Sequence, residues 1–258
     1  MQNRDLPVVL SIAGHDPGGG AGIQADIETI GALGGLPASV ITCLTVQDTV
    51  NVERIAPVEP TLVEEQLECI LQDYQVGAIK IGLLGDARIA SIIGAVLRRH
   101  PRVPLVLDPV LAAGGGKEMT RKGLIDAMQY DLFPLVSLIT PNSEEARRLT
   151  GEQDLAACAE QLLHRGIDAV LITGTHEESE EVINQLYRPG LGTLALSWPR
   201  LHGSYHGSGC TLASAIATIL ALGTPLEEAV EQGQQLTWDA LNHATHPGRG
   251  QAIPHRRL

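Results

Sequence analysis

The sequence predicts an α/β protein in which a mostly parallel sheet carries helices on both faces. Short apolar runs end at glycine, Asp-Pro or Thr-Pro, and amphipathic segments with helical spacing lie between them. Late in the chain, two extended stretches are separated by Arg188, Pro189 and Gly190, which indicates an antiparallel hairpin. Hydrophobic residues make up 44% of the 258 residues but aromatic residues only 3%, so we expect a core of Leu, Ile, Val and Ala.

The expected strands and helices alternate along the chain. A short apolar run bounded by a turn signal indicates a buried strand, and a longer run with amphipathic spacing indicates a helix. The expected strands cover residues 8–13, 39–44, 78–81, 105–107, 136–139 and 170–172, followed by the hairpin over 181–187 and 193–198. The expected helices cover residues 23–33, 62–74, 87–99, 210–222 and 225–243. No linker or internal repeat interrupts this order, so we expect a single domain over residues 1–258.

The charge balance argues against two classes of partner. The formal net charge is −12, and Lys80, Lys117 and Lys122 are the only lysines, so no basic surplus exists to bind nucleic acid or an anionic membrane. The first residues lack a signal-peptide pattern, and no apolar run approaches a membrane-spanning length. We therefore expect a cytoplasmic protein that binds neither nucleic acid nor membrane.

The first of two glycine-rich stretches covers residues 14–22, between an expected strand and an expected helix. That order suits a phosphate-binding or dinucleotide-binding loop. The spacing fails the dinucleotide pattern G-x-G-x-x-G, because Ile23 stands where the third glycine would follow Gly18 and Gly20. The chain also lacks a G-K-[ST] sequence, so neither standard nucleotide-binding motif is present.

The second stretch covers residues 205–211 and leads into an apolar helical run. Glycines at 207 and 209 let the backbone bend, and free N–H groups at the helix start favour an anion such as phosphate. A thiol at this place, Cys210, is expected to have a lowered pKa. Taken alone, the stretch fits a tight turn with a buried cysteine slightly better than a phosphate pocket.

Polar residues recur where the expected strands end. Asp108, Asn142 and Thr173 each follow a buried run, and open parallel sheets bind ligands at this edge. Each has a purely structural alternative, since Asp108 could begin a turn and Asn142 could cap the helix that holds Glu144 and Glu145. Their recurrence at one edge favours a site.

Three stretches together carry a resemblance: Ala-Gly-His-Asp-Pro-Gly-Gly-Gly-Ala-Gly-Ile-Gln-Ala-Asp at 13–26, Thr-Val-Gln-Asp-Thr at 45–49 and His-Gly-Ser-Gly-Cys-Thr-Leu at 206–212. The chain resembles the ribokinase-like small-molecule kinases, and more narrowly the hydroxymethylpyrimidine/phosphomethylpyrimidine kinases of thiamine synthesis, over roughly residues 8–245. Most ribokinase-like enzymes have aspartate where Cys210 stands, whereas cysteine is similar to the pyrimidine branch and to some pyridoxal kinases. The resemblance implies a three-layer α/β/α fold.

The resemblance also implies a substrate site. Gln47 would read the pyrimidine ring, since an amide offers a donor and an acceptor side by side. Gly14, Asp26, Leu83 and Val110 would belong to the same pocket. The chain departs from the family at Leu83, where methionine is common, and at His15 and Gly18 in the substrate loop.

Further roles follow from the resemblance for the phosphoryl group, the nucleotide and the metal. Gly207, Ser208, Gly209 and Cys210 would form an anion hole, with Cys210 as candidate general base. The positions implied for ATP are Asn142, Thr173, Gly174 and Thr211, and those implied for Mg²⁺ are Glu145 and Asp108. Thr173 stands where the family often has a lysine, so one phosphate-binding charge is missing.

The expected activity is ATP-dependent phosphorylation of 4-amino-5-hydroxymethyl-2-methylpyrimidine, and then of its monophosphate, with ATP and Mg²⁺ as cofactors. The resemblance implies a homodimer. Two alternatives stay open: a pyridoxal/pyridoxine kinase of the same superfamily, and a non-catalytic α/β binding protein.

Overall fold

The structure is a computed structural model that describes residues 6–111 and 123–256, so Lys117 and Lys122 lie outside the described residues. The described residues form one sheet of nine strands in the order β3-β2-β1-β4-β5-β6-β7-β8-β9. The strands are β1 Val8–His15, β2 Leu36–Gln47, β3 Val52–Pro57, β4 Val76–Ile81, β5 Leu105–Leu107, β6 Leu138–Ile139, β7 Val170–Ile172, β8 Glu181–Tyr187 and β9 Leu194–Pro199.

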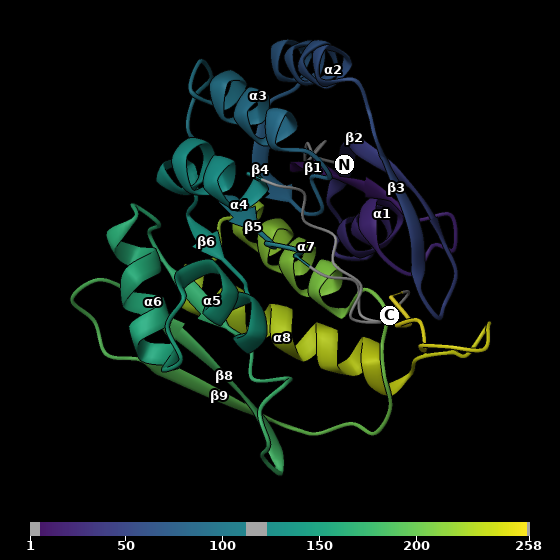
Figure 1. The fold of residues 1–258 in the computed structure, drawn as a ribbon, viewed down its shortest axis with the longest axis vertical. Coiled ribbons are helices and arrows are strands. Elements are labelled where there is room, and N and C mark those ends of the chain that lie inside the picture. The colour runs from purple at the N-terminus through teal and green to yellow at the C-terminus, as the bar shows by residue number, and fades with distance from the viewer. Residues whose placement is uncertain (1–5, 112–122, 257–258) are drawn as a thin grey trace, which may run out of the picture.

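Helices connect most of these strands (Figure 1). They are α1 Gly22–Ala32, α2 Pro60–Asp73, α3 Ala87–Leu97, α4 Leu124–Ala127, the π-helical η1 Met128–Leu132, the 3₁₀ turn η2 Phe133–Leu135, α5 Ser143–Thr150, α6 Leu155–His164, α7 Ser208–Ala221 and α8 Leu226–Asn242.

The sheet is parallel across its centre and antiparallel at both edges. Strands β2, β1, β4, β5, β6 and β7 pair in parallel. At one edge β3 runs antiparallel to β2, and at the other the hairpin β8–β9 continues antiparallel from β7. The predicted mostly parallel sheet with a late antiparallel hairpin is therefore confirmed.

Apolar side chains alternate between the two faces of the sheet, as the pleat requires. In β5, Leu105 and Leu107 belong to the core beneath α2 to α6, whereas Val106 belongs to the core beneath α1, α7 and α8. Figure 1 shows these two groups of helices on opposite sides of the strands. The three-layer arrangement is confirmed, and burial on both faces explains why the central strands are continuous apolar runs.

Several elements differ from the sequence-based expectation; among them, the short helices α4, η1 and η2 were not expected. Strand β3 was not expected, because only its first residue, Val52, is fully buried and its half-exposed positions give no apolar run. Helix α6 was also not expected, although Asp154 caps it by accepting the N–H of Ala157 at 2.9 Å. Helix α7 begins at Ser208 rather than at 210, so the glycine-flanked motif forms its first turn.

Among the described residues, no helix combines the length and the apolar character needed to cross a membrane.

Candidate active site

The candidate site lies where the parallel strands end. Strand β1 lies between β2 and β4. The chain passes from β1 to β2 on one side and from β4 to β5 on the other, so the connections after the neighbouring strands β1 and β4 leave in opposite directions. Open α/β sheets bind ligands at such a switch point, outside the carboxyl ends of the strands. The two glycine-rich stretches, Gln47 and Asp108 all follow or end strands at this edge.

The start of α7 is built around Gly207. Its φ of +79° is a left-handed conformation that favours glycine, and a Cβ there would lie 2.0 Å from the carbonyl oxygen of Gly20. Helix α7 has no acidic residue in its first turn, which therefore keeps the positive end of the helix dipole uncompensated by its own side chains. Ser208, Gly209 and Cys210 supply the first N–H groups of this helix, a suitable environment for a phosphoryl group.

Asp108 lies directly beside this turn. Its carboxylate oxygens lie 3.4 Å from the position that a Cβ of Gly209 would occupy. The side chain is buried, and within the described part of the chain its Oδ2 has no hydrogen-bond partner. Burial raises the pKa of Asp108 to about 6, although the nearby Lys80 ammonium and a hydrogen bond with Cys210 act in the opposite direction.

Cys210 does not have the lowered pKa that its place at a helix start predicted. Burial raises the pKa of its thiol to about 12, even though the residue keeps part of its surface exposed. The carboxylates of Asp108 and Asp26 add to the rise, while Lys80 and a hydrogen bond from the Gly22 backbone oppose it. Desolvation and two neighbouring carboxylates therefore outweigh the helix dipole, and the thiol is protonated at neutral pH.

Asp26, expected at the substrate site, is held in a buried ion pair with Lys80. It is completely buried, and both its oxygens contact the Lys80 ammonium, at 2.8 and 2.9 Å. Ser11 and Ser214 donate further hydrogen bonds to it, at 2.5 and 2.8 Å. A Cβ on Gly82 would lie only 2.7 Å from the Lys80 nitrogen. This buried pair joins β1, β4, α1 and α7 beneath the site, and its ammonium is the positive charge that acts on Cys210 and Asp108.

Three of the residues expected at the substrate site do come together. A small apolar cluster separate from the two main cores contains Cys43, Val52, Leu83, Ile55 and Val110. Gly14 lies against it, since a Cβ on Gly14 would be 2.8 Å from Sγ of Cys43 and 3.1 Å from Cδ2 of Leu83. Gly14, Leu83 and Val110 thus surround one apolar patch at the ends of β1, β4 and β5, and the unexpected strand β3 supplies part of it.

Asp16, which the sequence did not single out, organises the loop after β1. Its carboxylate accepts N–H groups of Gly18 and Ala21, both at 2.8 Å, and contacts Nε2 of His206 at 3.0 Å. Burial opposes ionisation, but hydrogen bonds from His206, Gln47 and Gly18 lower the pKa of Asp16 to about 2. The side chain of Gln47 is therefore tethered to the same carboxylate that holds the loop before α1. An Asp-Pro-Gly sequence is a known turn signal that could have indicated this role.

Asn142 and Glu145 form the first turn of α5. Oδ1 of Asn142 accepts the Glu145 N–H at 2.8 Å, and Oε2 of Glu145 accepts the Asn142 N–H at 3.1 Å, which is a capping box. Oε1 of Glu145 also accepts the N–H of Leu111 at 3.3 Å. Burial, and then the charge of Asp108, raises the pKa of Glu145 to about 8. Two neighbouring buried carboxyls with raised pKa values, one with an unpartnered oxygen, fit a divalent cation bound between them.

Comparison with known proteins agrees with this geometry. The sequence profile of the phosphomethylpyrimidine kinase family matches residues 16–255. The chain belongs to this family. It is 36% identical over 251 residues to the hydroxymethylpyrimidine/phosphomethylpyrimidine kinase of Haemophilus influenzae, covering 94% of this chain and 93% of that protein. The resemblance inferred from the three stretches is therefore confirmed.

Two further relatives show the range of the family. The thiamine biosynthesis bifunctional protein ThiED of Geobacter sulfurreducens is 39% identical over 247 residues; the match covers 94% of this chain, which spans about half the length of that protein. The structure of a Staphylococcus aureus pyridoxal kinase in complex with AMP-PCP and pyridoxal matches with a TM-score of 0.89 at 28% identity, covering 98% of this chain and 94% of the other. The ribokinase-like fold is confirmed.

Within this phosphomethylpyrimidine kinase fold, two residues expected to bind ATP are already engaged. Thr211 is completely buried, and its hydroxyl donates to the carbonyl of Gly207 at 2.9 Å and accepts from Arg256 at 2.8 Å. Gly174 donates its N–H to Oδ1 of Asn184 at 3.0 Å, and a Cβ there would lie 2.3 Å from the Ile183 carbonyl oxygen. These contacts hold the start of α7 and the turn after β7 in place.

Thr173, another position expected to bind ATP, lies beside Asn142. It forms a parallel β-bridge with Asn142, and its carbonyl accepts the N–H of Ser143 at 3.0 Å. The residue is partly exposed at the carboxyl end of β7. Thr173 and Asn142 thus lie side by side at the same edge as Asp108.

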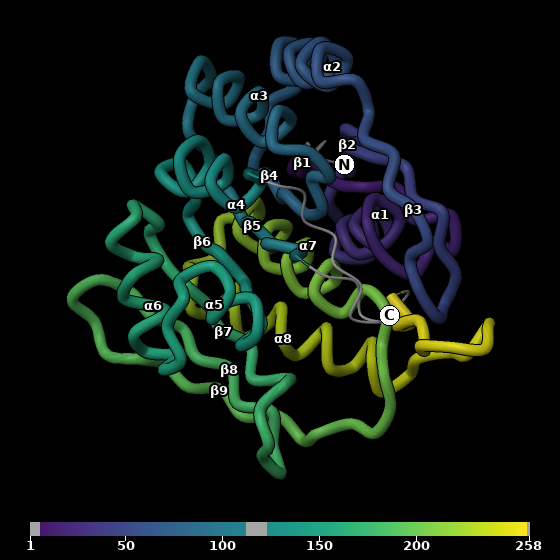
Figure 2. The backbone as a smooth tube through the Cα atoms, in the orientation of Figure 1, coloured from purple at the N-terminus to yellow at the C-terminus, as the bar shows by residue number. Residues whose placement is uncertain are grey.

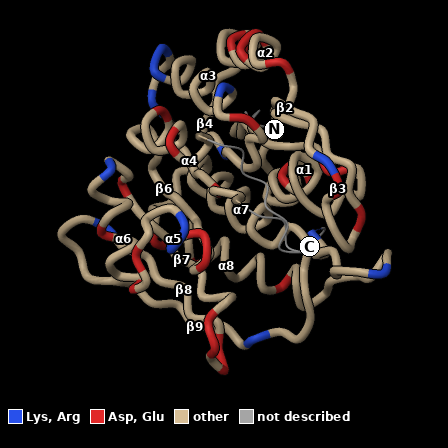
Figure 3. The backbone as a smooth tube through the Cα atoms, in the orientation of Figure 1, with Lys and Arg blue, Asp and Glu red and all other residues tan. Residues whose placement is uncertain are grey.

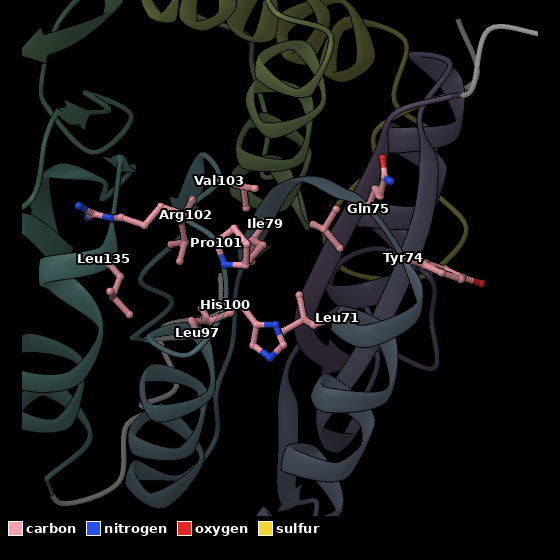
Figure 4. Close-up of a pocket in the computed structure, with 12 residues that line it drawn as sticks. Leu71, Tyr74, Gln75, Ile79, Leu97, His100, Pro101, Arg102, Val103 and Leu135 are labelled. Carbon is pink, nitrogen blue, oxygen red and sulfur yellow. The ribbon is translucent and has the colours of Figure 1, made fainter.

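Two other surface features of this kinase lie elsewhere. A cavity of about 320 Å³ lies at the other end of the parallel strands, beside Val76 and Leu105, where β4 and β5 begin (Figure 4). Figure 3 shows that acidic residues gather along α2; two of them, Glu64 and Glu68, bind Arg99. The charge of the candidate site comes instead from a few buried groups, namely Asp108, Glu145 and the Lys80–Asp26 pair.

Proposed function

We propose that this kinase transfers the terminal phosphoryl group of ATP to the hydroxymethyl oxygen of 4-amino-5-hydroxymethyl-2-methylpyrimidine, and then to the resulting monophosphate. The observation that carries the proposal is the meeting of Cys210 and Asp108 at the glycine-flanked start of α7. The name of the Haemophilus influenzae relative supports the same pair of reactions.

The pyrimidine ring is proposed to lie against the apolar cluster formed by Leu83, Val110 and the residues around Gly14. A flat heteroaromatic ring suits such a patch, and glycine at 14 leaves room for close approach of the backbone. The tether to Asp16 fixes the Gln47 amide while leaving its oxygen and one N–H for an aminopyrimidine edge.

The transferring phosphoryl group is proposed to lie at the first turn of α7, with the nucleotide beside Asn142 and Thr173. Asp108 and Glu145 would hold Mg²⁺, which would neutralise charge on the phosphates when bound. Phosphoryl transfer passes through a loose transition state, so positioning and charge neutralisation carry most of the catalysis. Backbone N–H groups aimed at the phosphoryl oxygens contribute on the scale of about 3 kcal/mol each in comparable oxyanion sites.

The proton of the substrate alcohol is proposed to pass late in the reaction to the pair formed by Cys210 and Asp108. The thiol is protonated at neutral pH and the carboxyl, with a pKa of about 6, is mostly ionised, so the pair has one vacant place for a proton. Cys210 would relay the proton to Oδ1 of Asp108, which leaves the unpartnered Oδ2 for the cation. This assigns the role of base to the pair, whereas the sequence had indicated Cys210 alone.

Pyridoxal phosphorylation is the second candidate. The match to a pyridoxal kinase that binds both AMP-PCP and pyridoxal supports it, and pyridoxal is also a flat heteroaromatic ring with a hydroxymethyl group. We also propose a homodimer of single-domain chains, which the exposed Leu36, Leu44 and Val46 on β2 support. Mass measurement in solution tests the dimer.

The activity is tested by ADP release with hydroxymethylpyrimidine, pyridoxal and ribose in parallel, each with MgATP. We expect the highest kcat/KM with hydroxymethylpyrimidine. A higher value with pyridoxal supports the second candidate, and turnover of none of the three contradicts both and favours a binding protein. Mass spectrometry of the product separates one phosphorylation from two.

A further inference from the structure

The C-terminal segment, residues 245–256, lies against all three stretches that carry the family resemblance. Ala252 exchanges hydrogen bonds with Ser204 and His206, both at 2.9 Å, just before α7. The N–H of Gln251 donates to the carbonyl of Thr49 at 2.8 Å, in the loop after Gln47. In Figure 2 this yellow segment lies between the loop joining β2 to β3 and the start of α7.

Arg256 ends this segment inside the protein, with only 1% of its surface exposed. Its Nη2 donates to the carbonyl oxygen of Gly20 at 2.5 Å, and its Nε donates to Oγ1 of Thr211 at 2.8 Å. Its Nη1 lies 3.4 Å from Oε2 of Glu28 on α1. One planar guanidinium thus joins the glycine-rich loop to the first turn of α7, which the single ammonium of a lysine could not do in the same geometry.

Arg256 binds at the point where the backbones of Gly20 and Gly207 approach each other most closely. The carbonyl oxygen of Gly20 accepts a hydrogen bond from Arg256. A Cβ on Gly207 would lie 2.0 Å from this oxygen and 2.8 Å from Nη2 of Arg256. Burying a cation is costly unless hydrogen bonds compensate it. Two of its three partners, Gly20 and Thr211, belong to the loop and to the start of α7. The cost of burying the Arg256 cation is therefore offset only when the loop and the helix start lie side by side as observed.

We propose that Arg256 is a positioning residue that holds the glycine-rich loop against the start of α7, so that the anion hole has its catalytic geometry. The segment 245–256 also links this contact to the loop after Gln47 through Thr49. The inference rests on the proposed kinase function. Arg256 contacts neither the substrate nor the phosphoryl group in this account, and acts through Gly20 and Thr211.

The test compares Arg256→Met and Arg256→Lys with the matched control Arg249→Gln. Arg249 belongs to the same segment, but its side chain is 89% exposed and lies 3.7 Å from Asp48. We expect Arg256→Met to lower kcat about 100-fold, the scale of a misplacement of about 1 Å, with KM for the pyrimidine little changed. Arg256→Lys should recover only a small part of the lost kcat, because lysine keeps the charge but cannot make both hydrogen bonds, to Gly20 and to Thr211. Arg249→Gln should behave as wild type.

Amide hydrogen exchange gives a second readout that needs no activity. We expect faster exchange in Arg256→Met over residues 18–22 and 207–211, with β7 and β8 unchanged, and no such change in Arg249→Gln. If the wild-type protein phosphorylates none of the substrates and Arg256→Met still shows this exchange pattern, the proposed function fails and the positioning role stands. Full activity of Arg256→Lys, unchanged kcat in Arg256→Met, or faster exchange over the whole chain would each overturn the inference.

Discussion

Gly207 lies so close to Gly20 that a Cβ on Gly207 would be 2.0 Å from the Gly20 carbonyl oxygen. These two residues lie far apart in the chain and belong to the two glycine-rich stretches. Their contact brings the loop after β1 to the start of α7. The anion site therefore depends on two glycines for separate reasons: a left-handed backbone at Gly207 and close approach of two backbones.

Replacing Gly207 by Ala tests this contact. The substitution meets both a left-handed φ, which costs an L-residue about 1–2 kcal/mol, and a backbone oxygen that must move. Gly190→Ala is the matched control, because Gly190 has a φ of +70° but no atom within 4 Å of a would-be Cβ. We expect Gly207→Ala to lower the free energy of unfolding more than Gly190→Ala and to reduce kcat about 100-fold. Equal losses of stability and equal kcat values would contradict the account; urea unfolding and steady-state assays measure both.

Asp108→Asn tests whether this carboxyl is kept at the site at a cost in stability. Its pKa of about 6 lies above the ordinary 3.8, so the folded protein binds this proton more tightly than the unfolded chain does. The stability that the proton contributes is complete below about pH 4 and is lost as the pH rises through 6. Asn cannot titrate, so the stability of Asp108→Asn relative to wild type should rise by about 2–3 kcal/mol between pH 4 and pH 8. Urea unfolding of both proteins at the two pH values measures the difference, and activity at pH 8 should fall strongly.

Asp16→Asn tests the tether on Gln47. The neutral amide accepts hydrogen bonds less strongly than the carboxylate, whose pKa of about 2 reflects the partners His206, Gln47 and Gly18. We expect KM for the pyrimidine to rise about tenfold, because Gln47 loses its orientation, while the Kd for ATP changes less than twofold. Gln47→Leu should raise the same KM in the wild-type background and add little to Asp16→Asn. Independent, additive effects of the two substitutions would show that the tether does not act through Gln47.

The sequence predicted those parts of the fold that depend on local patterns. The central strands β5 and β7 were placed correctly because burial on both faces leaves an uninterrupted apolar run. Strand β3 was missed because its stability comes from pairing with β2 rather than from its own side chains. Helix α7 was placed two residues late because Ser208 and Gly209 have weak helix propensity.

The candidate site was predictable where a sequence motif determines the backbone conformation. It was not predictable where residues distant in sequence determine a side chain's contacts or its pKa. Gly14, Leu83 and Val110 gather as expected. The contacts of Asp26 with Lys80 and of Thr211 with Arg256 could not be predicted, because these partners are 54 and 45 residues away in sequence. The raised pKa of Cys210 likewise depends on Asp108 and on burial, which no local pattern reveals.

The central claim is that phosphoryl transfer to the pyrimidine takes place at the start of α7, beside Cys210. Replacing Cys210 by Ala removes the thiol and leaves the helix, its N–H groups and Asp108 in place. The most direct measurement is the single-turnover rate of phosphoryl transfer from ATP to hydroxymethylpyrimidine in wild type and Cys210→Ala, with the Kd for ATP determined alongside. The account predicts a rate at least 100-fold lower in the variant, within the usual range for a group that accepts a proton in the transition state, and an unchanged Kd. A wild-type rate in Cys210→Ala would contradict it.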